Sequence, residues 1–135
     1  TAARGRAAMA AMQWPAFSAL LSEYFRHQGF RVVAGSDAGA EGSADMMLQR
    51  GSERFVVRSR LWHAQRVGVQ PVRELFSVIA SSHAAGGFIV TSGIFTPEAH
   101  LFAQGREVVL VDGQTLHETI RKQSIQTTEA VPRRT

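Results

Sequence analysis

The sequence contains no cysteine, which removes several kinds of chemistry. Disulfide bonds, thiolate metal ligands and cysteine nucleophiles are all excluded. No apolar run approaches the roughly 18 residues that a membrane-spanning helix requires. The lack of cysteine favours a reducing compartment, so we expect a cytoplasmic protein with no membrane segment in this chain.

Other catalytic signatures are missing as well. The histidines are scattered, and none pairs with another at the spacing of an HxxxH metal motif. The glycine-rich stretch GSDAGAEGSAD lacks the lysine of a P-loop and leads into a predicted strand rather than a helix. The threonine and serine of GGFIVTSG have no identifiable partner base. A histidine metal centre, a nucleotide-binding loop and a serine hydrolase are therefore disfavoured.

The chain is long enough for one domain with its own core. It has 135 residues, of which 44% are hydrophobic. We expect the domain to span residues 13–122, with an Ala/Arg-rich lead-in over 1–12 and a flexible polar tail over 123–135. The lead-in could extend a helix or be disordered.

The basic character of the chain is concentrated in two places. The formal net charge is +4, and residues 1–12 and 123–135 contain four arginines against one acid, which leaves about +1 for the body. Within the body, six arginines between residues 45 and 75 face only three acids. Such a local patch can bind phosphates even when the whole domain is nearly neutral.

Hydrophobic periodicity predicts an alternation of helices and strands. Apolar residues at three- and four-residue spacing after Trp14 indicate a helix that Gly29 ends. Pro71, Thr96 and Asp112 mark the starts of three more helices, the last ending near Lys122. Leu101 and Phe102 are expected to face the core. Strands are predicted over residues 30–34, 45–49, 54–62, 86–92 and 107–111, with loops over 35–44 and 64–70.

The order of these elements predicts the fold class. Three strands joined by short loops favour a meander, and the later strands alternate with helices, which favours parallel pairing through right-handed crossovers. We therefore expect an α/β domain whose mixed central sheet of about five strands is flanked by helices on both faces.

The strand RFVVRSRLW raises a question of charge. Side chains alternate along a strand, so Arg58 and Arg60 share one face of an otherwise apolar segment. Guanidinium groups there need an anionic partner if they are buried. A carboxylate of this protein, a phosphate of a partner and plain water are the three candidates.

Several segments carry a resemblance to a known family. They are WPAFSALLSEYFRHQGFRV, GAEGSADMML, FVVRSRLW, VGVQPVRELFSV and GGFIVTSGIFTPEA. Together they resemble the catalytic domain of Mrr-type restriction endonucleases, within the PD-(D/E)XK nuclease superfamily. The resemblance runs from about Trp14 to Ile120 and implies a restriction-endonuclease-like fold.

The resemblance also implies where an active site would lie. The family's aspartate at the second strand is matched by Asp45, and its Gln/Glu-x-Lys triplet falls on Arg58-Ser59-Arg60. An acidic residue in the preceding glycine loop is matched by Glu41, whereas a glutamate often found in the first helix is replaced by Ser18. Thus the positions are retained, while the Gln/Glu and the lysine are lost.

Those replacements change the chemistry that the site can perform. Metal-assisted phosphodiester cleavage needs oxygen ligands for Mg²⁺ and a group that activates water. Arg58 offers no acceptor atom, and the guanidinium of Arg60 does not lose its proton in proteins. No cofactor is expected, although Asp45 and Glu41 are the metal ligands if any metal binds.

The leading interpretation is an Mrr-type domain that binds DNA and has lost cleavage. The resemblance implies that Asp45 lies near Arg58 and Arg60, and Glu74 is a second candidate partner for one of them. DNA phosphates would then be bound by Arg58 and Arg60, and by three further basic residues, His63, Arg66 and Arg73. Solvated charges and a structural ion pair are the simpler explanations of the same residues, and Trp62 is expected to pack rather than to stack on bases.

Two other functions stay open at this stage. One is an active, Mg²⁺-dependent DNA endonuclease whose ligands have moved to Asp45 and Glu41, with Arg60 replacing the lysine. The other is a non-catalytic protein–protein interaction domain in which Asp45 holds the two arginines. A homodimer and a fusion to further domains are compatible with all three.

Overall fold

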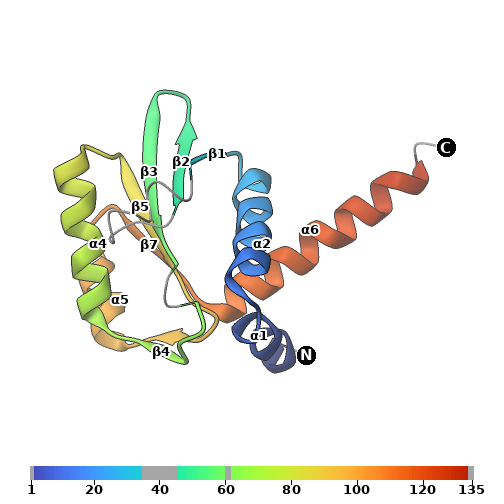
Figure 1. The fold of residues 1–135 in the computed structure, drawn as a ribbon, viewed down its shortest axis with the longest axis horizontal. Coiled ribbons are helices and arrows are strands. Elements are labelled where there is room, and N and C mark those ends of the chain that lie inside the picture. The colour runs from blue at the N-terminus through green and yellow to red at the C-terminus, as the bar shows by residue number, and fades with distance from the viewer. Residues whose placement is uncertain (1, 35–45, 60–61, 134–135) are drawn as a thin grey trace.

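A five-stranded mixed sheet forms the centre of the computed structural model, which describes residues 2–34, 46–59 and 62–133 (Figure 1). Its strand order is β1-β2-β3-β5-β7. The strands are β1 (Arg31–Ala34), β2 (Met46–Arg50), β3 (Glu53–Arg58), β5 (Gly86–Val90) and β7 (Val108–Val111). The first three pair antiparallel and the last two pairings are parallel, which confirms the predicted meander followed by crossovers.

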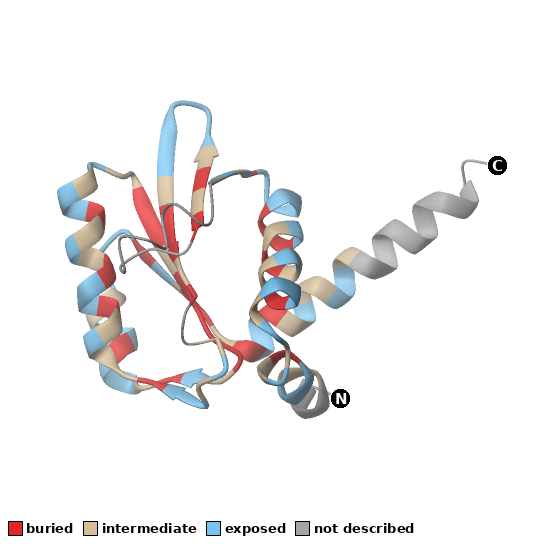
Figure 2. Cartoon of the chain, in the orientation of Figure 1, coloured by how far each residue is buried: buried red, intermediate tan, exposed pale blue. Residues whose placement is uncertain are grey.

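Helices cover both faces of this sheet, as the sequence predicts (Figure 1). On one face lie α1 (Ala2–Ala10), α2 (Trp14–His27) and the start of α6 (Gly113–Arg133). On the other lie α4 (Val69–Ser82) and α5 (Pro97–Ala103). Figure 2 shows buried residues along the strands and on the helix faces that meet them. The first twelve residues thus include a helix, and Met9 of α1 is buried in the core.

Strand alternation divides the core into two clusters. Val57 and Leu48 belong to the cluster under α2, whereas Val56 belongs to the cluster under α4. Because neighbouring side chains of a strand point to opposite faces, Arg58 lies on the same face as Val56 and faces the α4 layer. The alternation of side chains along β3 therefore places Arg58 next to α4 rather than in open solvent.

Two of the helices begin with the capping residues that the sequence predicts. The Thr96 hydroxyl accepts a hydrogen bond from the Ala99 N–H at 3.2 Å at the start of α5. An Asp112 carboxylate oxygen accepts from the Thr115 N–H at 2.9 Å at the start of α6. Each cap satisfies a backbone donor that the helix leaves unpaired.

Several predicted boundaries are wrong. The strand predicted over 54–62 ends at Arg58, because the Trp62 N–H donates to the Ser59 carbonyl at 3.0 Å and closes a turn. The last helix continues to Arg133 instead of ending near Lys122. Helix α4 begins at Val69, inside the predicted loop, and Pro71 lies in its first turn, where no N–H is needed.

Two further details differ from expectation. Leu101 is 65% exposed, because it lies on the opposite side of α5 from the fully buried Ala99; Phe102 does pack against the core. A two-stranded parallel sheet, β4 (Arg66–Val67) with β6 (Ile94–Phe95), was not predicted. The predicted loop over 35–44 lies outside the described residues.

Candidate nucleic-acid interface

Arg58 is the best-defined residue of the candidate site. It is the last residue of β3, aligned with Ile89 of β5. Its guanidinium Nη2 lies 3.1 Å from Glu74 Oε1 on α4, and the two side chains are 16% and 46% exposed. Glu74 is therefore the anionic partner of Arg58. This contact confirms the prediction that Glu74 pairs with either Arg58 or Arg60. The separation allows a charge-assisted hydrogen bond.

The ion pair does not satisfy the whole guanidinium. Arg58 Nε is buried and has no hydrogen-bond partner among the residues that the structure describes. An unpaired buried donor costs about 1–3 kcal/mol, and more when it carries charge. The end of β3 is therefore a place where an additional acceptor would be stabilising.

Three sequence-predicted site residues cannot be placed. Asp45, Glu41 and Arg60 lie outside the described residues. In the sequence, Asp45 directly precedes Met46, the first residue of β2, and Met46 pairs with Val57, the neighbour of Arg58. The predicted contact between Asp45 and the two arginines stays a prediction. Ser18, in α2, is described and lies partly buried.

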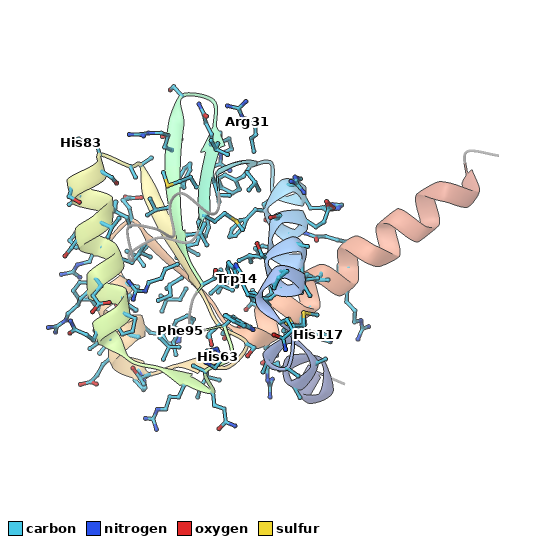
Figure 3. The ribbon with its side chains drawn as sticks, in the orientation of Figure 1. Trp14, Arg31, His63, His83, Phe95 and His117 are labelled. Carbon is cyan, nitrogen blue, oxygen red and sulfur yellow. The ribbon has the colours of Figure 1, made fainter. Side chains whose placement is uncertain are left out.

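His63 lies in the turn after β3, against the edge of the Trp62 ring, with ring centroids 4.9 Å apart. It also lines a pocket of about 310 Å³ between α1 and the turn that follows β5. Arg6, Gln65 and Ser92 contribute to the same pocket, and no carboxylate is among the residues described as lining it. Figure 3 shows His63 at the end of the sheet where α1 and α4 begin.

The structure separates the remaining basic candidates. Arg66 is exposed in β4, next to Ile94 of β6. The side chain of Arg73 extends toward α5, and its guanidinium carbon lies 5.6 Å from the Phe102 ring centroid. Arg73 is therefore directed toward Phe102, whereas its chain neighbour Glu74 pairs with Arg58. Sequence reasoning missed Arg6, because only the packing of α1 against α6 brings it near His63.

Aromatic packing fixes the turn that carries these groups. Trp62 packs on Trp14 and Phe17, with ring centroids 5.3 and 5.7 Å away. The Trp62 carbonyl accepts a hydrogen bond from the Ser92 N–H at 2.8 Å, which joins this turn to the end of β5. Trp62 is therefore a packing residue, as predicted, and it sets the position of His63.

The described part of the site does not fit a divalent metal ion. Arg58 occupies the strand position that the family resemblance gives to a Gln/Glu ligand, and it contributes a positive charge and no acceptor atom. The nearest described carboxylate, Glu74, is engaged by that guanidinium. Among the described residues, no group of three or more His, Asp or Glu side chains is arranged to hold a metal.

The fold and the sequence identify the class of the protein. A model of the catalytic domain of Mrr-type restriction endonucleases matches residues 9–120, which is most of the chain. The chain therefore belongs to this restriction endonuclease family. A search of curated protein sequences finds no significant match.

Solved structures share the fold. The restriction endonuclease MspJI, solved in complex with a 27-mer oligonucleotide, is 24% identical with a TM-score of 0.56 over 78% of this chain. A protein of unknown function, AF1548, is 15% identical with a TM-score of 0.53 over 69% of the chain. The chain spans only 26% and 54% of the lengths of these two proteins.

No described helix is long and apolar enough to cross a membrane.

Proposed function

We propose that this chain is a DNA-binding domain of the Mrr restriction endonuclease family that does not cleave DNA. The observation that carries the proposal is the position of Arg58 at the end of β3, where its guanidinium provides no acceptor atom for a metal and engages the neighbouring carboxylate of Glu74. A guanidinium at a position where the family uses a metal ligand repels a divalent cation and attracts a phosphate. We also propose that the protein is cytoplasmic and that it binds no cofactor.

Basic groups around Arg58 support an interface with the DNA backbone. His63 and Arg66 follow β3 in the chain, and Arg6 lines the pocket beside His63. Asp45 and Arg60 are included from the sequence alone: Asp45 would hold the two arginines, and Arg60 would contact a phosphate. Arg73 is a more distant contact on the α4 layer. Backbone contacts of this kind give binding that depends strongly on salt and weakly on sequence.

Cleavage is tested by incubating supercoiled plasmid, methylated and unmethylated, with the protein and Mg²⁺ or Mn²⁺. We expect no nicked or linear product, because Arg58 cannot contribute to a metal site. Cleavage that disappears in Asp45→Ala would overturn the proposal in favour of an active endonuclease with shifted ligands.

Binding is tested separately, by a gel shift on a 20-base-pair duplex in EDTA at increasing salt. The wild type should shift the duplex at low salt, and Arg58→Gln and Arg66→Gln should each weaken binding and reduce the salt slope by about 1. Arg121→Gln is the matched control, since Arg121 is exposed on α6, away from β3. No shift by the wild type at low salt would favour a protein–protein interaction domain.

A further inference from the structure

A second cluster of arginines lies at the opposite end of the sheet. Arg26, Arg31 and Arg50 line a pocket of about 450 Å³, together with Gly29, Phe30, Gln49 and Gly51. They come from the last turn of α2, the start of β1 and the end of β2. No carboxylate is among the lining residues. Figure 3 shows Arg31 beside the β2–β3 hairpin, far from His63.

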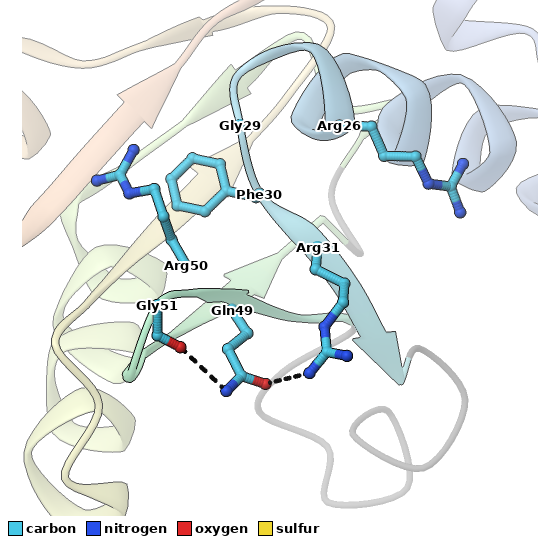
Figure 4. A pocket seen from close by; sticks show the side chains of 7 residues that line it. All are labelled: Arg26, Gly29, Phe30, Arg31, Gln49, Arg50 and Gly51. Atoms are coloured by element: carbon cyan, nitrogen blue, oxygen red, sulfur yellow. Dashed lines mark hydrogen bonds between the residues drawn. The ribbon is translucent and has the colours of Figure 1, made fainter.

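The three guanidinium groups are held in place by different contacts (Figure 4). Arg31 Nη2 donates to Gln49 Oε1 at 2.8 Å, and Gln49 Nε2 donates to the Gly51 carbonyl at 3.3 Å. The guanidinium carbon of Arg50 lies 4.5 Å from the Phe30 ring centroid and 5.6 Å from that of Phe55. Only Arg26 has a carboxylate partner among the described residues, Glu23 at 3.2 Å. Neither Arg31 nor Arg50 therefore has a carboxylate within ion-pair distance among the described residues, and the nearest acid in the strand register is Glu53, opposite Arg50 in the hairpin.

The arrangement suits an extended polyanion better than one small ion. Figure 4 shows the guanidinium groups of Arg26, Arg31 and Arg50 spread around the pocket rather than converging on one point. Successive phosphates of a nucleic-acid backbone, which guanidinium groups recognise well, suit such a spread arrangement.

The second cluster is separated from Arg58 both along the sheet and across it. Five residue steps of β3 separate Glu53, beside the pocket, from Arg58, which is roughly 17 Å along the strand. Val56 and Val57 between them are buried, and Arg50 packs on Phe30 and Phe55 on the α2 side, whereas Arg58 faces α4. The two clusters would therefore contact different segments of nucleic acid.

We propose that Arg31 and Arg50 form a second DNA-backbone contact, at the closed end of the β2–β3 hairpin. The inference rests on the proposed function and extends it by a site that is remote from the family's catalytic positions. The cluster contributes affinity and no base readout, because guanidinium contacts to phosphates carry no sequence information.

The test measures the salt dependence of binding to the 20-base-pair duplex by fluorescence anisotropy. Arg31→Gln with Arg50→Gln should lower the slope of log K against log salt by about 2, and Arg121→Gln should not change it. Arg50→Lys keeps the charge and should restore the part of the slope due to position 50. Arg31→Gln alone, at an exposed side chain, should lower the slope by about 1 even if the double variant is unstable.

The outcomes separate this inference from the proposed function. An unchanged slope in Arg31→Gln and in the folded double variant, with a lowered slope in Arg58→Gln, overturns the second contact and leaves the proposed function standing. A lowered slope in the double variant with no effect of Arg58→Gln supports the second contact and removes Arg58 from the interface. No binding by the wild type at low salt overturns both.

Discussion

Arg58 and Glu74 form the ion pair on which the candidate site depends. A side chain that is only 16% exposed must have a partner for its charge, and α4 supplies a carboxylate at 3.1 Å. Glu74 was recognisable from sequence as a candidate partner, since the resemblance places its helix close to the site. The contact of Glu74 with Arg58 in particular required the structure, because alternation along a strand identifies a face and not the residue that meets it. The predicted contact of Asp45 stays a prediction.

The ion pair can be measured by a double-mutant cycle with Arg58→Gln and Glu74→Gln. We expect a coupling free energy of about 1 kcal/mol, because the arginine is mostly buried and the glutamate is half exposed. Urea unfolding of the four proteins gives this value. Additive effects, with no coupling, would mean that the contact does not stabilise the fold and that Glu74 does not hold Arg58.

Tyr24, the only tyrosine in the chain, gives a second test at the residue scale. Burial raises the pKa of its phenol above 10.0, since the charged form is desolvated. A raised folded-state pKa means that the stability contribution is complete below pH 10.0 and is lost as the pH rises through the folded-state value. Ultraviolet titration should give a midpoint above 10.0 in buffer and near 10.0 in denaturant. Equal titration midpoints in buffer and in denaturant would contradict the burial of Tyr24 in the core cluster under α2.

Among the elements, the contact between α4 and the sheet determines where Glu74 lies. Gly87 of β5 allows this approach, because a Cβ there would lie 2.8 Å from Ile79 Cδ1 and 2.9 Å from the Val56 carbonyl oxygen. A backbone oxygen cannot move away cheaply, so the helix or the strand would have to shift.

Gly87→Ala should therefore lower the free energy of unfolding by about 1–3 kcal/mol. Gly68→Ala is the control: a Cβ at this position would meet no described atom within 4 Å beyond its chain neighbours, and φ there is −89°. Because Gly68 is the N-cap of α4, where glycine is favoured over alanine, we expect that control to lower the stability by about 0.5 kcal/mol through the cap and without a clash. Thermal unfolding compares the two variants. Equal stability of Gly87→Ala and wild type would show that α4 is not seated closely on β5.

Most elements could be predicted because their periodicity is strong and their caps are explicit, as at Thr96 and Asp112. The two-residue strands β4 and β6 could not, since they form only when the segments after β3 and β5 meet: the Ile94 N–H donates to the Gln65 carbonyl at 3.0 Å. The extension of α6 beyond Lys122 was missed because this part of its sequence is polar. Leu101 was misplaced because hydrophobicity alone does not determine which side of a short helix is buried.

At the scale of the whole molecule, basic groups lie at both ends of β3 while the formal net charge is only +4. Arg58, His63 and Arg66 are near one end, and Arg31 and Arg50 are at the other. Composition located the patch between residues 45 and 75, but it could not assign Arg31 or Arg6, whose positions depend on strand pairing and helix packing. From sequence, the pairing of Glu74 with one of the two arginines was thus predictable and the wider interface was not, while the roles of Asp45 and Arg60 stay predictions.

This member of a metal-dependent nuclease family is proposed to have a site that repels cations. Titration calorimetry with Mn²⁺ tests it most directly, on the wild type and on Arg58→Glu with Arg60→Lys. We predict no saturable heat for the wild type and a measurable binding heat for the double variant, in which a carboxylate replaces a guanidinium. Saturable Mn²⁺ binding by the wild type, lost in Asp45→Ala, would contradict the account.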